Sequence, residues 1–180
     1  WQDRAMRDPW VMKHPYENKF IMAYTARASI NNDPYQCGVI GMAESNDLYE
    51  WKSTKPLFGG FFSQLEVPQI YNVENKWYCV FCNHPEDWSD EFKRNYNGPN
   101  KRGTHYLIAD KFEGPWNLAP GPYLTTSSEI ELYACRIIEK DNKFFFMAFL
   151  HYDDDGNFIG EISDPILINF DKNGLMSLEI

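Results

Sequence analysis

The feature that most constrains the fold is a unit of short predicted strands that recurs along the chain. In each copy the second strand begins with a lysine and an aromatic residue: Lys19-Phe20, Lys76-Trp77 and Lys143-Phe144. The residues predicted to begin the innermost strands are Pro9, Pro68 and Ala134. A repeat of roughly 60 residues with four short strands is typical of a propeller blade. The sequence therefore predicts an all-β fold made of four-stranded antiparallel blades. The predicted strands include residues 49–51, 76–83, 143–152, 158–162 and 166–170.

The repeats predict one partial β-propeller domain over residues 1–180, with blades at 7–55, 60–120 and 128–175. Propellers close with about four to eight blades, so three blades form no ring. Because the chain starts at Trp1, we expect the remaining blades to be missing on the amino-terminal side. A partner chain that completes the ring is the other interpretation. The polar stretch 84–102 is predicted to be a long loop, because no helical periodicity interrupts the strands.

Composition excludes several classes of protein. Hydrophobic residues make up 43% of the chain and the net charge is −9, which favours a packed core and argues against a nucleic-acid partner. No apolar run is long enough to span a membrane. Cys79 and Cys82 have zinc-like spacing, but an odd offset in a strand points their side chains to opposite faces. We therefore expect thiols in the core, no metal site and no cofactor.

Two acidic residues occupy similar places in two of the units. Glu66 precedes Val67-Pro68 and an apolar strand, after a loop that contains Phe61 and Phe62; Asp8 follows Arg7 and precedes Pro9. Each residue has an ordinary interpretation, Glu66 as an exposed pre-proline residue at a strand edge and Asp8 as a strand cap. Their equivalent positions favour carboxylate chemistry at one shared site. Glycoside cleavage needs two carboxyl groups that flank the scissile bond.

These residues resemble motifs of the five-bladed propeller of glycoside hydrolase family 32 and its relatives in families 43 and 68. The segment Arg7-Asp8-Pro9 is similar to the family's Arg-Asp-Pro motif. Leu65-Glu66-Val67-Pro68 resembles its Glu-Cys-Pro motif, with Val67 in place of the cysteine. Tyr133-Ala134 is similar to the Tyr-Ala that opens the fifth blade. The resemblance covers nearly the whole chain, as blades three to five.

The resemblance implies a role for each matched residue. Glu66 would be the general acid/base, Asp8 the transition-state stabiliser and Arg7 a partner of a carboxylate or of the sugar. The family's nucleophile is an aspartate in an Asn-Asp-Pro motif, which does not occur in this sequence. Four further residues are candidates for sugar contact: Phe61, Phe62, Tyr133 and Arg136.

The leading hypothesis is part of a glycosidase that acts on β-fructofuranosides or related furanosides. It carries the acid/base but lacks the blade that bears the nucleophile, so we expect this chain alone to be inactive. The alternatives are a non-catalytic carbohydrate-binding propeller, an arabinosidase or xylosidase of the family 43 type, and a structural piece that completes its ring with another chain. The partner is a carbohydrate in the leading hypothesis and in the first two alternatives.

Overall fold

The computed structural model describes residues 5–28, 33–125, 131–153 and 155–180. These residues form three antiparallel sheets. Short strands of the kind predicted dominate, and their bounds are β1 Met6–Lys13, β2 Phe20–Arg27, β3 Gly38–Ser45, β4 Lys52–Ser53, β5 Phe58–Gly59, β6 Glu66–Val73, β7 Lys76–Asn83, β8 Gly103–Ala109, β9 Asn117–Leu118, β10 Leu132–Lys140, β11 Lys143–Tyr152, β12 Phe158–Ile162, β13 Ile166–Phe170 and β14 Met176–Leu178. The first three residues of the predicted third blade, 128–130, lie outside the described residues.

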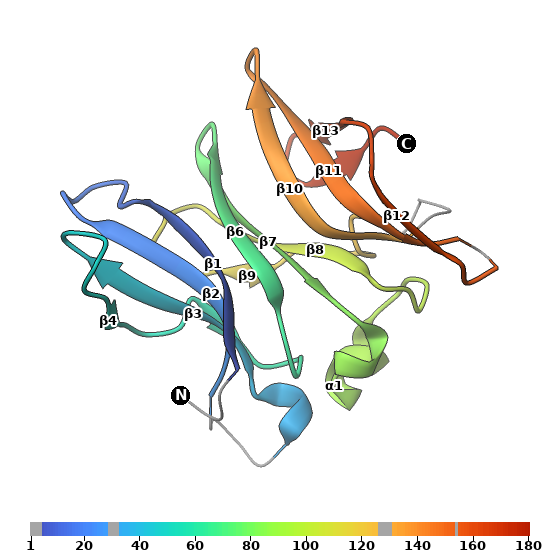
Figure 1. Ribbon diagram of the computed structural model, residues 1–180, viewed down its shortest axis with the longest axis horizontal. Helices are drawn as coiled ribbons and strands as arrows, with labels where there is room; N and C mark the ends of the chain where they lie inside the picture. Colours follow the sequence, from blue (N-terminus) through green and yellow to red (C-terminus); the bar gives the residue numbers. More distant parts are fainter. Residues whose placement is uncertain (1–4, 29–32, 126–130, 154) are drawn as a thin grey trace.

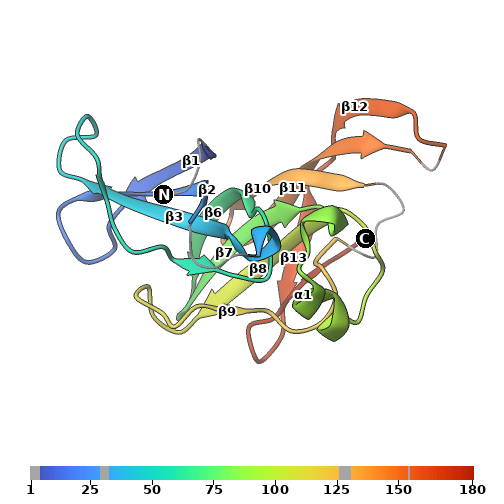
Figure 2. The same ribbon diagram turned by 90° about the horizontal axis from the view of Figure 1, so that it is seen from below.

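Each sheet runs from an inner strand, which comes first in the chain, to outer strands that follow it. The strand orders are β1-β2-β3-β4, β6-β7-β8-β9 and β10-β11-β13-β14, with β5 paired to β3 and β12 paired to β11. Figure 1 shows the inner strands β1, β6 and β10 side by side, with the rest of each sheet fanning away from them. Seen from below, the sheets face one another like adjacent blades (Figure 2). This is the radial arrangement that the repeats predict.

Apolar faces of neighbouring sheets hold the blades together. One core lies between the first and second sheets and includes Ile21, Ile40, Phe81 and Leu107. A second core lies between the second and third sheets, around residues such as Val80 and Phe146. Both faces of the middle sheet are therefore buried, and β7 reads as the nearly continuous apolar run Trp77–Cys82. Because both faces of β7 are buried, its sequence lacks the alternation of apolar and polar residues that a half-exposed strand shows.

The inner strands begin earlier than predicted, because a β-bulge interrupts each of them. The predicted starts at Pro9 and Ala134 lie inside β1 and β10, which begin at Met6 and Leu132. The predicted fourth strand at residues 49–51 is also wrong, since β4 is Lys52–Ser53. The strands β7, β11, β12 and β13 have the predicted bounds.

The stretch 84–102 is not the helix-free loop that we predicted. It contains a 3-10 turn, Pro85–Asp87, and the short helix α1, Asp90–Asn95, whose cap Ser89 accepts a hydrogen bond from Phe92 N. Trp88 and Phe92 are buried and pack against Tyr96 and Tyr123. An aromatic cluster therefore fastens this segment to the second sheet. The helix was missed because six residues are too few for a 3.6-residue period to appear.

Candidate active site

The same β-bulge occurs near the start of all three inner strands. Asp8 and Pro9 lie opposite the single residue between Ala23 and Thr25, because the pairing shifts between Arg7 and Trp10. The shift recurs between Glu66 and Gln69 in β6, and between Tyr133 and Arg136 in β10. The equivalent residues just before each bulge are thus Arg7, Glu66 and Tyr133. The sequence placed Glu66 in register with Asp8 and Ala134 with Pro68, whereas the structure pairs Glu66 with Arg7 and Ala134 with Val67.

The first bulged residue of each strand adopts the left-handed conformation. The φ angles are 56° at Asp8, 52° at Val67 and 49° at Ala134. This region is uncommon for any residue other than glycine and is an outlier for a β-branched residue such as Val67. Such strain concentrates at functional sites, where the surrounding structure holds it in place. Three equivalent bulges therefore mark the place where the inner strands aim side chains at one another.

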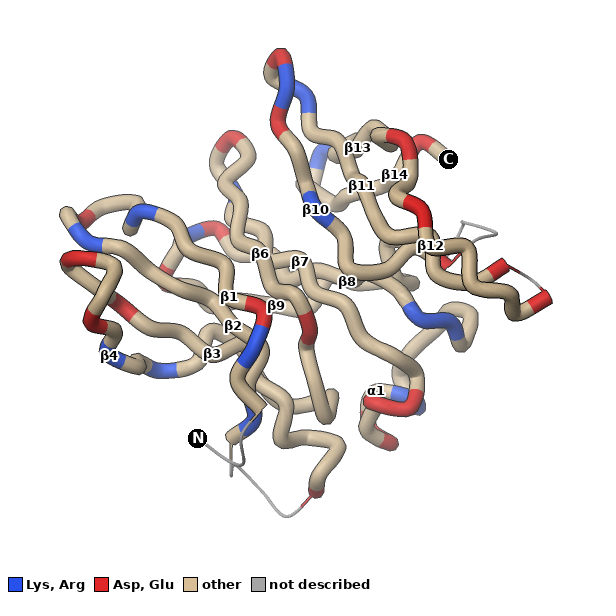
Figure 3. Tube along the Cα trace, in the orientation of Figure 1, with Lys and Arg blue, Asp and Glu red and all other residues tan. Residues whose placement is uncertain are grey.

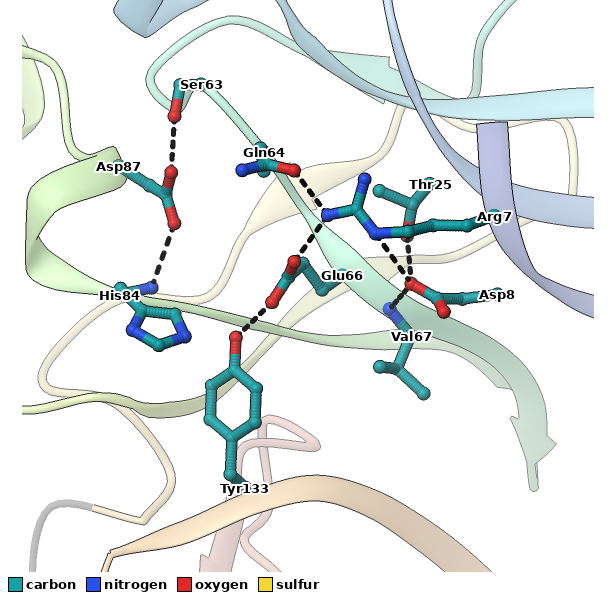
Figure 4. Close-up of polar contacts among 10 residues, drawn as sticks. All are labelled: Arg7, Asp8, Thr25, Ser63, Gln64, Glu66, Val67, His84, Asp87 and Tyr133. Atoms are coloured by element: carbon teal, nitrogen blue, oxygen red, sulfur yellow. Dashed lines mark hydrogen bonds and ion pairs between the residues drawn. The ribbon is translucent and has the colours of Figure 1, made fainter. Parts of the chain in front are cut away.

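Arg7 connects the two predicted carboxylates. Its Nη2 donates to Glu66 Oε1 and to Gln64 Oε1, and its Nε lies 3.6 Å from Asp8 Oδ2 (Figure 4). The Glu66 side chain is 19% exposed and that of Asp8 29%, so both remain open to a ligand. In Figure 3 the charged segments of β1 and β6 meet near the middle of the molecule. The two acids therefore share one polar site, although they come from different blades.

Asp8 is held at the junction of the first two blades. Its Oδ2 accepts a hydrogen bond from Thr25 Oγ1 at 2.9 Å and another from Val67 N at 3.3 Å. Val67 N belongs to the bulge of β6, so the strained backbone of the second blade orients the Asp8 carboxylate of the first blade. Aspartate tolerates the left-handed conformation better than most residues, which explains its compatibility with this position in β1.

Tyr133 completes the site from the third blade. Its hydroxyl donates to Glu66 Oε2, so the Glu66 carboxylate accepts from the first blade on one oxygen and from the third blade on the other. Burial raises the pKa of Tyr133 far above the ordinary value, and the nearby Cys82 and Glu66 raise it further. The phenol therefore stays protonated at neutral pH and remains a donor. Its ring packs edge-on against His84, with 4.9 Å between the ring centroids.

A second polar group supports the loop that precedes Glu66. Ser63 Oγ donates to Asp87 Oδ1, and His84 N donates to Asp87 Oδ2 at 3.3 Å (Figure 4). Ser63 N also donates to the Asp87 carbonyl at 2.7 Å. These bonds hold the segment after β7 against residues 59–65. The backbone that leads into Glu66 is thereby fixed from two sides.

The other predicted sugar-contact residues have different surroundings. Phe62 is fully buried, with ring centroids 5.7 Å from Phe81 and 4.7 Å from Phe92, so the prediction that it stacks on a sugar is wrong. Phe61 is half-buried and stacks on Phe58. The guanidinium of Arg136 donates to Cys135 O at 3.0 Å instead of to Glu66. Contact of Phe61 or Arg136 with a sugar remains a prediction.

Sequence reasoning missed Gln64, Thr25 and Asp87. Gln64 lies two residues before Glu66, the spacing that puts two strand residues on one face, and this signal was available. Thr25 and Asp87 reach the site only through pairing and loop closure, which no local pattern reveals. Among the described residues, no group of three or more His, Cys, Asp or Glu side chains could hold a metal ion. No helix in the described part of the chain is long and apolar enough to cross a membrane.

Taken together, the radial sheets and the inner-strand site define the class of fold. The chain folds as three blades of a β-propeller, with a cluster of carboxylates and their partners where the inner strands begin. Comparison of the chain with known proteins then shows which particular proteins it resembles.

The relatives are proteins that are named for fructose-containing sugars. The chain is 25% identical over 137 residues to a levansucrase of Rahnella aquatilis. That match covers 62% of this chain and 32% of the relative. An inulosucrase from Halalkalicoccus jeotgali, solved bound to kestose, superposes with a TM-score of 0.78 at 19% identity, over 96% of this chain and 49% of that one. A levansucrase from Gluconacetobacter diazotrophicus gives a TM-score of 0.74 at 15% identity, with 97% and 44% covered. No protein-family profile matches.

These comparisons confirm the resemblance predicted from the sequence. A GH32 β-fructofuranosidase of Bombyx mori also superposes, with a TM-score of 0.70 at 15% identity, over 99% of this chain and 38% of that one. The chain thus has the fold of the β-propeller fructosidases and fructosyltransferases. It spans less than half of the length of each of these relatives.

Proposed function

We propose that the chain supplies the acid/base half of the active site of an enzyme that cleaves β-fructofuranosides. The observation that supports this most is the joining of Asp8 and Glu66, from two blades, into one polar site through Arg7. A glycosidase needs a carboxyl group that donates a proton to the glycosidic oxygen and a second group that acts on the sugar carbon. The names of the relatives point to a fructoside as the substrate.

In the proposed mechanism Glu66 donates its proton to the oxygen that leaves with the departing sugar. It later takes a proton from the incoming water or sugar hydroxyl, which is the reverse step. Tyr133 and Arg7 orient its two oxygens, and Asp8 holds hydroxyl groups of the fructosyl unit. The nucleophile that attacks the sugar carbon comes from a part of the propeller outside this sequence. The chain alone is then a binding half-site without turnover.

Substitution of Glu66 tests this function in the protein that carries the chain together with the rest of its propeller. We expect Glu66→Ala to lower kcat on sucrose at least about 100-fold, because general acid catalysis typically supplies that much. Added azide should restore part of the turnover of an activated fructoside by attacking in place of water. Glu74→Gln, at the exposed β6–β7 turn, is the matched control. Unchanged activity of Glu66→Ala would remove Glu66 from the mechanism.

The alternative function is that of a non-catalytic carbohydrate-binding propeller. The absence of an Asn-Asp-Pro motif from the sequence fits this alternative as well as it fits an enzyme whose nucleophile lies on another blade. Calorimetry with kestose and sucrose separates the two functions. Binding without turnover, in a protein that includes all of its blades, supports the alternative; turnover that disappears in Glu66→Ala supports the enzyme.

A further inference from the structure

A second cleft lies at the end of the inner strands opposite to Glu66. Strand β6 begins at Glu66 and ends at Val73, so the β6–β7 turn lies roughly 20 Å from the inner-strand site along the strand. Figure 1 shows this turn and the β10–β11 turn projecting at the same end of the sheets. A cleft of about 580 Å³ lies between them, a size typical of ligand sites, and residues of β13 also line it. The mechanism proposed above uses none of its residues.

The buried and half-buried residues of this cleft are apolar. Phe144 of β11 and Phe170 of β13 line it, and their rings pack edge to face with 5.9 Å between the centroids. Val73 of the second blade and the buried Ile168 of the third blade also line it. An apolar base of this kind packs against the C–H face of a ligand ring, while polar groups around it fix the ring's orientation.

The exposed residues of the cleft are polar, and several have no partner in the described part of the chain. The side chains there that make no hydrogen bond or ion pair with any described residue are Glu139, Asn142, Lys143 and Asn169. An amide both donates and accepts, a carboxylate accepts and an ammonium donates. Hydroxyl groups also donate and accept, so this mixed set matches neighbouring hydroxyl groups on a sugar ring.

The charges in the cleft argue against an ionic ligand. Glu74 and Glu139 repel an anion, and Lys143 repels a cation. A smaller cleft of about 210 Å³ shares Val73, Glu74 and Phe170 with the first, so the two adjoin across the β6–β7 turn. A neutral polar ligand that is longer than one ring fits this combined groove best.

We propose that this groove is a second carbohydrate site, which binds a segment of a neutral polysaccharide at a distance from the reaction. We call it the turn-side groove, and its principal residues are Glu139, Lys143, Phe144, Asn169 and Phe170. The choice of a fructan as the polysaccharide rests on the proposed function, whereas binding in the groove does not involve Glu66. A polymer held there stays on the protein while chain ends enter the inner-strand site. The groove therefore matters for long substrates and not for sucrose.

The test measures binding of inulin and levan by affinity electrophoresis, with the protein that carries the chain together with the rest of its propeller. The Glu66→Ala background prevents degradation of the polymers. Asn169→Leu and Lys143→Met each remove polar groups of the groove at similar side-chain size. We expect each to weaken retardation about five- to tenfold, the effect of losing one or two hydrogen bonds. Asn18→Leu and Lys111→Met, exposed outside the groove, are the matched controls and should bind as the background does.

Sucrose kinetics and urea midpoints separate this inference from the proposed function and from misfolding. With Glu66 intact, the two groove variants should keep the kcat, the KM and the urea midpoint of the wild type. Retardation that is absent in the background protein, or equal in the groove variants, would overturn the inference, and so would a parallel loss of polymer binding and stability. If the wild type does not cleave sucrose, the proposed function fails, yet retardation by inulin or levan that the groove variants lose would still support the second site.

Discussion

At the residue scale, the site depends on backbone conformations that its side chains do not prefer. Val67 is β-branched and adopts a φ of 52°, where a Cβ substituent crowds the backbone. This conformation positions the site, because it directs the Val67 N–H at Asp8 and the preceding Glu66 side chain toward Arg7. Strain of this kind costs about 1–3 kcal/mol and persists only where neighbouring contacts enforce it.

We predict that Val67→Gly is more stable than Val67→Ala by about 1 kcal/mol. Both variants lose the valine methyl groups, but only glycine relieves the left-handed strain at this position. The free energy of unfolding from urea titration measures the difference. At Val73, which ends the same strand in an ordinary conformation, the order should reverse, with glycine the less stable variant. Equal stabilities of the two Val67 variants would mean that the bulge is not strained.

At the scale of the elements, the inner strands are joined by side chains instead of by a shared ladder. Gln69 is fully buried in β6, and its Nε2 donates to Cys135 O of β10. The Tyr71 hydroxyl donates its one hydrogen to Gln69 Oε1, accepts a hydrogen bond from Ile137 N at 3.3 Å and lies 3.1 Å from the Ile137 carbonyl oxygen. These bonds fix β10 against β6, and so fix the position of Tyr133 relative to Glu66.

Replacement of Gln69 by leucine should destabilise the fold by about 1–3 kcal/mol, because the Cys135 carbonyl then loses its buried donor. The urea midpoint reports this loss. Asn97→Leu, at an exposed position, serves as the control and should change stability by less than about 0.5 kcal/mol. Stability equal to that of the control would show that the polar link between the blades is dispensable.

At the scale of the whole molecule, the free energy of unfolding should depend on pH through one buried histidine. His105 of β8 is 1% exposed, and its ring stacks on Tyr123 with centroids 4.6 Å apart. Burial lowers the pKa of His105 to about 3. The folded protein therefore keeps this ring neutral at pH values where the unfolded chain already binds a proton. The resulting stability is present above pH ~6.5 and is lost as the pH falls toward ~3.

We predict that His105→Phe weakens the decline of stability between pH 6.5 and pH 4. The wild type should lose up to about 1.4 kcal/mol for each pH unit from this group, and the variant should lack that contribution. Urea titrations at several pH values measure the slope, and stability at pH 7 provides the reference for any packing change. Identical slopes would show that His105 does not link protonation to unfolding.

Local patterns were enough to predict the class of fold and the bounds of β7, β11, β12 and β13. In the units that contain β7 and β11, a lysine–aromatic pair, an apolar run and a turn lie within a few residues of one another. Pairing between consecutive strands depends mainly on such local signals. Asp8 and Glu66 could be selected in the same way, because both lie near the start of a unit, and their catalytic roles remain predictions. Phe62 was wrong for the opposite reason: an aromatic residue in a loop has the same local pattern whether it faces a ligand or the aromatic cluster around Phe92.

By itself, then, the sequence determined the all-β repeats, since these depend on neighbours in the chain, and it placed the two acids near the starts of two units. Tertiary structure alone decided which side chains meet. The bulges at Asp8, Val67 and Ala134 arise from pairing between strands, and they turn the residues before them toward a common centre. Gln64, Thr25 and Tyr133 enter the site through contacts between distant segments. Such contacts depend on how blades pack, and packing is a property of the folded chain as a whole.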